Sequence, residues 1–221
     1  MDCNCQCQGI EIKFDEEYVA KKLDKYRKKG PKNTTRDLIE ALKAQDIDGN
    51  TLLDIGGGIG DVQHALLHSG ASTAVDVEAS TAYLEACKVE AERQGHGQRI
   101  QHFQGDFVAL EDEIAPADIV TLDRVVCCYH DMTSLVALSA GKARRLYGLV
   151  YPRDKWWVKV AMALYYNLRF WLQKNPFRIY VHSNGAVEEL IRACGLRLQS
   201  ARNMGAWQVQ VFTRLLQHVD N

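Results

Sequence analysis

The chain has 221 residues, with 27 Lys and Arg against 28 Asp and Glu, and a formal net charge of -1. This length favours one domain, or little more, with a sizeable buried core. The balanced charge argues against a general nucleic-acid binder, because such domains usually carry a clear basic excess.

The first residues contain neither a signal peptide nor a regular metal-binding motif. Met1 to Lys22 lacks an apolar segment, and no later run reaches the roughly 18 apolar residues of a membrane span. Cys3, Cys5 and Cys7 alternate with polar residues, whereas ordinary zinc sites use longer spacings. We favour a frayed, unliganded terminus over a shared soft metal. We expect a cytoplasmic protein with no metal site, whose seven cysteines are reduced.

A basic helix and a shorter helix precede the first strand. Eight Lys or Arg fall between Lys21 and Arg36. Within this range, Gly30-Pro31 predicts a turn that ends the basic helix. A solvated helical face is the simplest interpretation, and attraction of an anionic acceptor or of RNA is the alternative. Thr34 and Asp37 have capping-box spacing, which predicts a second helix from Asp37 to Gln45.

The stretch from Thr51 to Asp61 reads T-L-L-D-I-G-G-G-I-G-D and predicts a buried strand, a glycine-rich turn and a helix. Glycine permits a positive φ and a close approach of the backbone to a ligand. A dinucleotide fingerprint requires a small residue where this chain has Asp61. An acid at this helix N-terminus suits a cationic ligand better than a pyrophosphate. The turn therefore predicts a nucleotide-type cofactor and disfavours a dinucleotide.

Three further apolar strands follow, each with an acidic residue at or just after its end. They are Ser72 to Val77 with Asp76, Ile100 to Phe103 before Gly105-Asp106-Phe107, and Ala117 to Asp123. Together with the pattern Asp54-x-Gly56-x-Gly58-x-Gly60, this order resembles the successive motifs of class I S-adenosylmethionine-dependent methyltransferases. The resemblance covers roughly Thr51 to Pro152.

The resemblance implies that S-adenosyl-L-methionine is the cofactor. It implies that Asp76 accepts hydrogen bonds from both ribose hydroxyls and that Asp106 lies near the adenine amine. The loop from Arg124 to Met132 would face the methyl group and the acceptor. The expected cofactor residues are Asp54, Gly56, Gly57, Gly58, Gly60, Asp76, Val77, Asp106, Phe107 and Asp123.

Few obligatory catalytic residues are expected, because the sulfonium carries an already activated methyl group. Within the loop, His130 titrates near neutrality and is the expected general base, with Tyr129 or Asp131 as orienting partners. A surface histidine at a helix start is the alternative. Cys127 and Cys128 are expected to be small buried hydrophobes, and binding of a thiol-reactive acceptor is the alternative.

The segment after a fifth strand, Tyr147 to Tyr151, departs from the minimal fold. Lys155 to Leu172 predicts a long helix that is apolar or aromatic over much of its circumference. Near the carboxyl ends of the strands, this helix would form a lid over an apolar, planar acceptor. Core packing is one alternative. Contact with a membrane surface through 155–174 is another, with Lys155, Lys159, Arg169 and Lys174 at the polar edge.

The remaining residues complete an α/β fold. Arg178 and His182, in an extended segment, are candidate acceptor contacts. A helix from Ala186 to Cys194 follows, and then two strands, Leu196 to Asn203 and Ala206 to Leu215. We expect a single doubly wound, mostly parallel sheet of seven strands, with an antiparallel C-terminal hairpin and helices on both faces.

The resemblance also suggests how this single domain, residues 1–221, is divided. It comprises an N-terminal helical cap (1–50), a cofactor-binding core (51–152), an inserted aromatic helix or lid (153–184), and a C-terminal helix with a hairpin (185–221). The motifs of amide, adenine and cytosine methyltransferases are absent.

We therefore expect methyl transfer to an oxygen or nitrogen atom of a small, apolar or planar acceptor, by a monomer or homodimer. The plan is similar to small-molecule methyltransferases, including the magnesium-protoporphyrin O-methyltransferase group. A non-catalytic S-adenosylmethionine-binding protein and an NAD(P)-dependent oxidoreductase are the alternatives.

Overall fold

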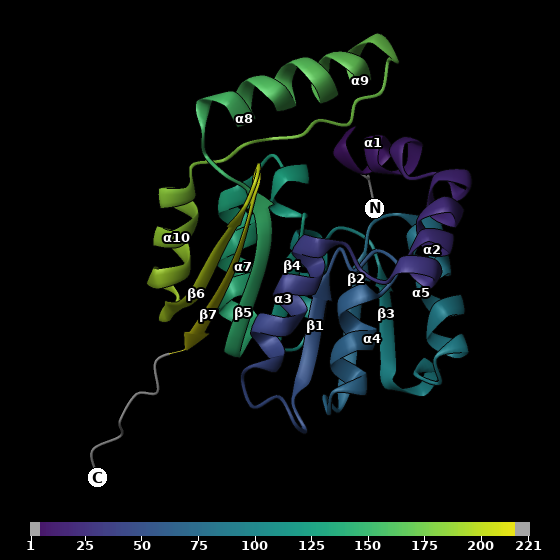
Figure 1. Cartoon of the computed structure of the whole chain (residues 1–221), viewed down its shortest axis with the longest axis vertical. Helices are drawn as coiled ribbons and strands as arrows, with labels where there is room; N and C mark the ends of the chain where they lie inside the picture. The colour runs from purple at the N-terminus through teal and green to yellow at the C-terminus, as the bar shows by residue number, and fades with distance from the viewer. Residues whose placement is uncertain (1–4, 215–221) are drawn as a thin grey trace.

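A central sheet with helices on both of its faces forms the body of the protein (Figure 1). The computed structural model describes residues 5–214. Within this range the sheet has seven strands in the order β3-β2-β1-β4-β5-β7-β6. Neighbouring strands are parallel from β3 to β5, and β7 runs antiparallel to both β5 and β6. The predicted sheet and its antiparallel hairpin are confirmed.

The strands are β1 (Thr51–Ile55), β2 (Thr73–Glu78), β3 (Ile100–Gln104), β4 (Ala117–Asp123), β5 (Ala143–Pro152), β6 (Leu196–Met204) and β7 (Trp207–Arg214). The α-helices are α1 (Cys5–Lys13), α2 (Glu16–Lys29), α3 (Asn33–Lys43), α4 (Asp61–His68), α5 (Thr81–Arg93), α6 (Phe107–Leu110), α7 (Met132–Lys142), α8 (Trp156–Ala161), α9 (Leu168–Leu172) and α10 (Asn184–Ala193). Short 3-10 turns cover Gly97–Arg99, Glu111–Glu113 and Val126–Cys128.

Two apolar cores cover the two faces of the sheet, because side chains alternate along each strand. Leu53 and Val120 pack with buried residues of α6, α7 and α10. Their neighbours Leu52 and Ile119 pack with buried residues of α3, α4 and α5 on the other face. The continuous apolar character of β1 and β4 therefore reflects burial on both sides.

Two expectations near the N-terminus are wrong. Helix α3 begins at Asn33 after Lys32, so Thr34 lies inside the helix and does not form a capping box. The Thr34 hydroxyl instead accepts a hydrogen bond from Arg124 Nη2. The terminus is not frayed from Cys5 onward, where α1 begins. Cys3 lies outside the described residues.

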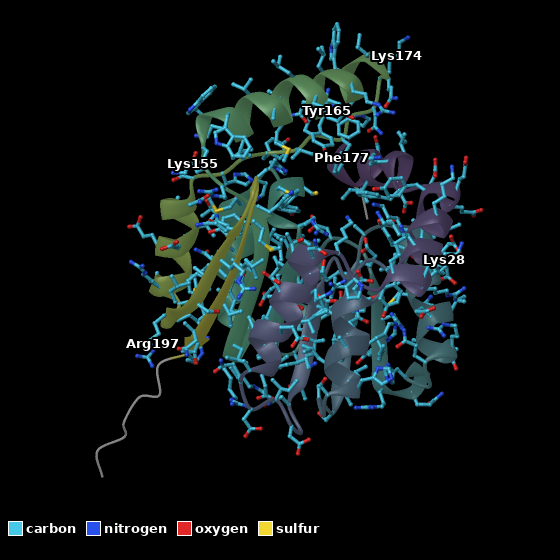
Figure 2. The ribbon with its side chains drawn as sticks, in the orientation of Figure 1. Lys28, Lys155, Tyr165, Lys174, Phe177 and Arg197 are labelled. Atoms are coloured by element: carbon cyan, nitrogen blue, oxygen red, sulfur yellow. The ribbon has the colours of Figure 1, made fainter. Side chains whose placement is uncertain are left out.

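The predicted aromatic helix is confirmed as a continuous helical stretch, residues 156–172, formed by α8, a π-helical segment (Met162–Asn167) and α9. We call it the aromatic helix. It lies across one end of the molecule, beside α1 and beyond the carboxyl ends of the strands (Figure 1). Residues 173–183 lead back from this helix, and we call them the returning chain. Phe177, in the returning chain, lies below the aromatic helix (Figure 2). The Phe177 ring contacts Phe170 of α9 and Phe14 after α1, with centroids 5.3 and 5.6 Å apart.

Among the helices of residues 5–214, none has the length and apolar character needed to cross a membrane.

Candidate functional site

A cavity of about 680 Å³ lies at the carboxyl ends of β1, β2 and β4, beneath α1 and the aromatic helix. Open parallel sheets commonly bind ligands in this position. The residues predicted from the sequence that line it are Asp54, Gly56, Gly57, Gly58, Val77, Asp106, Phe107, Asp123 and Tyr129. Four other predicted residues, Gly60, Asp76, His130 and Asp131, do not line it.

The glycine turn after β1 uses its glycines in two ways. Gly56, Gly58 and Gly60 have φ values of +64°, +62° and +84°, in the left-handed region that side chains disfavour. Gly57 is restricted instead by space, because a Cβ there would lie 2.4 Å from Asp76 Oδ1 and 2.3 Å from Gln63 Nε2. The turn therefore presents bare backbone to the cavity and rests on buried polar side chains.

A buried hydrogen-bond network supports this turn from below. Gln63 Nε2 donates to Asp54 Oδ2 at 3.2 Å and to Asp76 Oδ1 at 2.9 Å. Thr121 Oγ1 donates to Asp54 Oδ1 at 2.6 Å, which ties β1 to β4. Burial raises the pKa of Asp54 well above its usual range. The network fixes the relative positions of the strand ends that form the cavity floor.

The position of Asp76 differs from the expectation for a ribose contact. Its side chain is fully buried, and Asp76 Oδ2 lies 3.0 Å from His102 Nδ1 on β3. Its other oxygen is bound to Gln63, as described above. Asp76 therefore belongs to the network below the turn and is not among the cavity-lining residues.

Glu78, two residues later, occupies the cavity position that was expected for Asp76. Its Oε2 accepts from Gly58 N at 3.0 Å and its Oε1 from Ser80 N at 2.8 Å. Burial raises the pKa of Glu78 to about 7. Because β2 runs through Glu78, the last acid of the strand is Glu78 and not Asp76. The run Asp76-Val77-Glu78 contained this signal, since it places two acids on one face of the strand.

Two carboxylates next to the turn have oxygens without a hydrogen-bond partner in the described part of the chain. These buried atoms are Asp61 Oδ1, at the start of α4, and Asp123 Oδ1, at the end of β4. Asp123 Oδ1 lies 3.6 Å from Arg124 Nη1, in an ion pair beyond hydrogen-bond distance. Asp123 Oδ2 accepts from Thr35 Oγ1 at 2.5 Å. Burial, followed by the charge of Asp123, raises the pKa of Asp61 to about 7. Both residues line the cavity, so this corner suits a positively charged group.

Lys32 supplies a cation beside these two acids and was not singled out in the sequence. It lines the same cavity. Burial, followed by the charge of Arg124, lowers the pKa of Lys32 to about 8, and the nearby Asp123 opposes this shift. An amine flanked by buried carboxylates provides charges of both signs, as a zwitterionic amino-acid group requires.

The other half of the cavity is aromatic and contains the cations Lys13, Lys22 and Arg169. Its rings belong to Phe14, Tyr18, Tyr166, Phe170 and Phe177. Lys13 Nζ lies 4.2 Å from the centre of the Tyr18 ring, in a cation–π geometry. Burial, followed by the charge of Arg169, lowers the pKa of Lys13. This half suits an apolar ring system that carries an anionic substituent.

The loop after β4 places only one of the three expected catalytic residues in the cavity. The Tyr129 hydroxyl donates to Asp106 Oδ2 at 2.7 Å. His130 is exposed, and its ring stacks on Tyr129 outside the cavity with centroids 5.5 Å apart. Asp131 caps α7 by accepting from Ser134 N at 3.1 Å, and the hydrogen bonds from Ser134 lower its pKa. The positions of His130 and Asp131 do not support a role in proton transfer.

Cys127 and Cys128 line the cavity, with their sulfur atoms 3.8 Å apart. Both thiols donate to the carbonyl oxygen of Arg124 at 3.3 Å. The Cys128 thiol, followed by burial, raises the pKa of Cys127 well above its usual range. Cys127 is therefore a protonated, buried thiol at neutral pH, as expected for a small apolar residue.

The two candidate acceptor contacts on the returning chain act on the backbone instead. Arg178 Nη1 donates to the carbonyl oxygens of Asn175 and Phe177, at 2.6 and 2.7 Å. His182 Nε2 lies 2.9 Å from the carbonyl oxygen of Tyr129, and burial lowers the pKa of His182. Neither side chain lines the cavity, so both are better described as fixing the loops around it.

Comparison with known families identifies one match. Residues 7–143 match a family model described as an O-methyltransferase domain. This region begins in α1 and ends at the first residue of β5. None of the curated proteins compared with the chain matches it.

Solved structures share the fold at low sequence identity. An O-methyltransferase family protein from Burkholderia thailandensis is 15% identical over 90% of this chain, which spans 60% of that protein, with a TM-score of 0.69. Magnesium protoporphyrin IX methyltransferase from Synechocystis, with bound SAH, is 15% identical over 95% of this chain and 100% of that one, with a TM-score of 0.69. An O-methyltransferase family 2 protein from Planctomyces limnophilus, in complex with apigenin, is 18% identical over 83% of this chain and 58% of that one, with a TM-score of 0.64.

Proposed function

The chain belongs to the O-methyltransferase domain family and is an S-adenosylmethionine-dependent methyltransferase, and we propose that its acceptor is a small, apolar or planar molecule methylated on oxygen or nitrogen. The observation that carries this proposal is the division of one cavity into a glycine and acid half and an aromatic half. The first half suits the cofactor, and the second suits the acceptor.

The glycine and acid half fits the nucleoside of this cofactor. Gly56, Gly57 and Gly58 leave room for a ligand to approach the backbone. We assign the ribose hydroxyls to the Glu78 carboxylate, since it lies at the cavity end of β2. We assign the adenine to the region of Asp106 and Phe107, which line the cavity after β3. Asp54 and Asp76 support this surface from below.

The methionine end of the cofactor fits the corner that contains the Asp61 and Asp123 carboxyl groups. The ammonium group would donate to Asp61 Oδ1 and Asp123 Oδ1, which otherwise lack hydrogen-bond partners in the part of the chain that the structure describes. Lys32 would pair with the carboxylate. This arrangement would give hydrogen-bond donors to two buried carboxyl oxygens that lack them, which is costly in a buried site.

The aromatic half supports a flat acceptor with a negative group. Rings from α2, the aromatic helix and the returning chain surround it. Lys13 and Arg169 both line this half and repel one another, and this repulsion adds to the effect of burial in lowering the pKa of Lys13. A carboxylate or phosphate between them would relieve this repulsion, so we propose an acceptor with one anionic substituent.

Alignment of the acceptor is the main contribution that we propose for the protein. The bound cofactor supplies a sulfonium methyl group already activated for transfer. The rings hold the acceptor in line with that methyl group and exclude water. Tyr129, fixed by its hydrogen bond to Asp106, is the positioned side chain from the loop after β4. We propose no base role for His130 because it lies on the surface.

We retain the proposed organisation of the chain into a helical cap, a cofactor-binding core, an aromatic helix and a C-terminal hairpin. We also propose that the protein works in the cytoplasm. Among the described residues, Cys87, Cys127, Cys128 and Cys194 form no disulfide, as a reducing compartment would predict.

The test combines cofactor binding with turnover. Calorimetry should detect S-adenosylhomocysteine binding to the wild-type protein. A panel of flat phenols and amines, each with and without a carboxylate, should identify acceptors through release of S-adenosylhomocysteine. Lys13→Gln and Arg169→Gln should each raise KM for the carboxylated acceptors by about ten-fold and leave the neutral ones unchanged. Lys28→Gln, on exposed α2, is the matched control.

Three outcomes would contradict the proposal at different points. Absence of S-adenosylhomocysteine binding would argue against the cofactor assignment. Binding without methylation of any acceptor would favour a non-catalytic binding protein. Equal effects of Lys13→Gln on charged and neutral acceptors would contradict only the proposed anionic substituent, and not the proposed methyl transfer.

A further inference from the structure

The aromatic helix is apolar on two sides, and only one side serves the cavity. Val158, Met162 and Phe170 are buried on its inner side. Nine large apolar or aromatic residues of this helix are nevertheless exposed, out of twelve such residues in the described part of the chain. They are Trp156, Trp157, Val160, Leu164, Tyr165, Tyr166, Leu168, Trp171 and Leu172, of which Tyr166 also lines the cavity.

Exposure of these side chains is extensive. Trp156 is 77% exposed, Leu164 64%, and Trp171 64%, along the length of one helix. Globular proteins rarely leave a contiguous apolar surface of this kind in water unless it binds something. The cavity below does not use these three residues, since none of them lines it.

The charge around this helix has one sign. From residue 155 to residue 187 the chain contains five Lys or Arg and no Asp or Glu, although the whole chain carries 28 acids and 27 bases. Lys155 and Lys174 lie at opposite ends of the helix (Figure 2). Lys159 is paired with Asp154, which precedes the segment. The outer surface thus combines an apolar centre with tryptophans and lysines near both ends of the helix.

We propose that the outer side of the aromatic helix binds the surface of a bilayer that contains anionic lipids. Tryptophan and tyrosine favour the boundary between headgroups and acyl chains, where one part of the ring is apolar and the other is hydrated. Lysines at the ends of the helix would contact the negative headgroups. The helix would lie in the plane of the surface, because its amphipathic length is too short and too charged to cross the bilayer.

Charge argues for this occupant over a second copy of the chain. A symmetric pair would place the same surface against itself, and therefore bring the basic ends of both helices together. An anionic bilayer instead complements both features of the surface. The inference does not depend on the identity of the acceptor or on turnover.

The experiment is sedimentation of the full chain with lipid vesicles. One set of vesicles contains phosphatidylcholine alone, and the other an equal mixture of phosphatidylcholine and phosphatidylglycerol. Binding to the mixed vesicles is expected, with a blue shift of tryptophan fluorescence and weakening by salt. The triple change Trp156→Ser, Leu164→Ser and Trp171→Ser should reduce the partition constant about ten-fold or more.

A charge variant tests the second feature of the surface. Lys155→Glu with Lys174→Glu should reduce binding to the mixed vesicles about ten-fold or more. Leu198→Ser and Arg197→Glu change exposed residues of β6, away from the aromatic helix, and should leave binding unchanged (Figure 2). Unchanged S-adenosylhomocysteine affinity would show that each variant is folded.

Three results would overturn the proposal. One is the absence of binding to either kind of vesicle by a wild-type protein that binds S-adenosylhomocysteine. Another is vesicle binding that neither surface variant weakens. The third is a dimer, detected by light scattering, that the triple change dissolves while vesicles bind nothing, since this would assign the surface to a second copy.

Discussion

The two halves of the cavity are built by different means. The glycine and acid half is formed by the ends of neighbouring parallel strands, and a buried network through Gln63 joins two of them. The aromatic half is formed by helices and by a returning chain far apart in sequence, joined by ring contacts such as Phe14 with Phe177. In the first half, a buried side-chain network fixes the strand ends, whereas the second half combines ring packing with hydrogen bonds such as those between Asn167 and Ile179, both at 2.8 Å.

This difference indicates which half of the cavity tolerates amino-acid substitutions. A network of buried, hydrogen-bonded polar side chains loses stability steeply when one member is altered. Aromatic packing accepts substitutions of similar volume at smaller cost. We therefore expect variants of the first half to affect cofactor affinity strongly, and variants of the second half to affect mobility and acceptor choice. The following predictions test that separation, in order of expected effect on S-adenosylhomocysteine affinity.

The largest effect is expected at Gly57. Gly57→Val would place side-chain atoms against Gln63 and Asp76, where even a Cβ lies within 2.4 Å of both. Calorimetry should show about 100-fold weaker binding, since overpacking typically costs a few kcal/mol. Gly141→Ala, in α7 with open space around it, is the control and should bind normally. Normal binding by Gly57→Val would contradict the packing of the turn on the network.

The second-largest effect on affinity is expected at Glu78, and it tests whether Glu78 or Asp76 binds the ribose. Glu78→Gln should weaken binding roughly ten-fold, because a charged acceptor for the ribose hydroxyls is lost. Asp76→Asn should change affinity less than about three-fold, and lower the free energy of unfolding by about 1–2 kcal/mol instead. Calorimetry and thermal unfolding together measure both. The reverse pattern would restore Asp76 as the ribose contact.

A pH dependence of several-fold is expected from Asp61. Its carboxyl, with a pKa of about 7, is largely neutral at pH 6 and charged at higher pH, so affinity for a ligand ammonium should rise with pH. The rise should be about five-fold between roughly pH 6 and 7.5. Asp61→Asn should reduce this slope without abolishing it, since Glu78 also titrates at about 7. An unchanged slope in Asp61→Asn would refute the proposed ammonium contact.

The smallest effect on cofactor affinity is expected at Gly9, in the second half. A Cβ at Gly9 would lie 2.5 Å from Phe177 N, so Gly9→Val must displace α1 from the returning chain. Hydrogen exchange should become faster in α1 and in residues 173–183, while affinity stays within about two-fold. Gly185→Ala, in less crowded α10, is the control. A large loss of affinity would mean that the two halves are coupled.

Much of the fold and of the first half could be predicted from the sequence. Local patterns, such as the apolar run Leu52-Leu53 before the glycines, predict a strand and its turn. The run Asp76-Val77-Glu78 places two acids on one face of the strand, but the apolar pattern does not decide whether Glu78 belongs to β2. The sequence therefore predicted the ribose contact at Asp76, whereas we propose it at Glu78.

The second half and the loop were less predictable. No local pattern indicates that Phe14 meets Phe177, since their contact depends on how distant elements pack. The side-chain chemistry of His130 was evident, but its direction depends on the 3-10 turn at Val126–Cys128 that precedes it. Composition alone could therefore suggest an aromatic, basic lid, but not which of its residues line the cavity.

The π-helical segment Met162–Asn167 sets the rotational phase of the aromatic helix. In an α-helix, which has about 3.6 residues per turn, residues four apart do not lie directly above one another. Each such residue drifts further around the helix axis than the one before it. Wider i→i+5 turns reverse that drift, so that Met162, Tyr166 and Phe170 all reach the cavity. Regular α-helical turns over the same six residues would instead rotate α9 about the helix axis and carry Phe170 away from the cavity. The width of the turns in these few residues therefore decides which rings face the acceptor and which face outward.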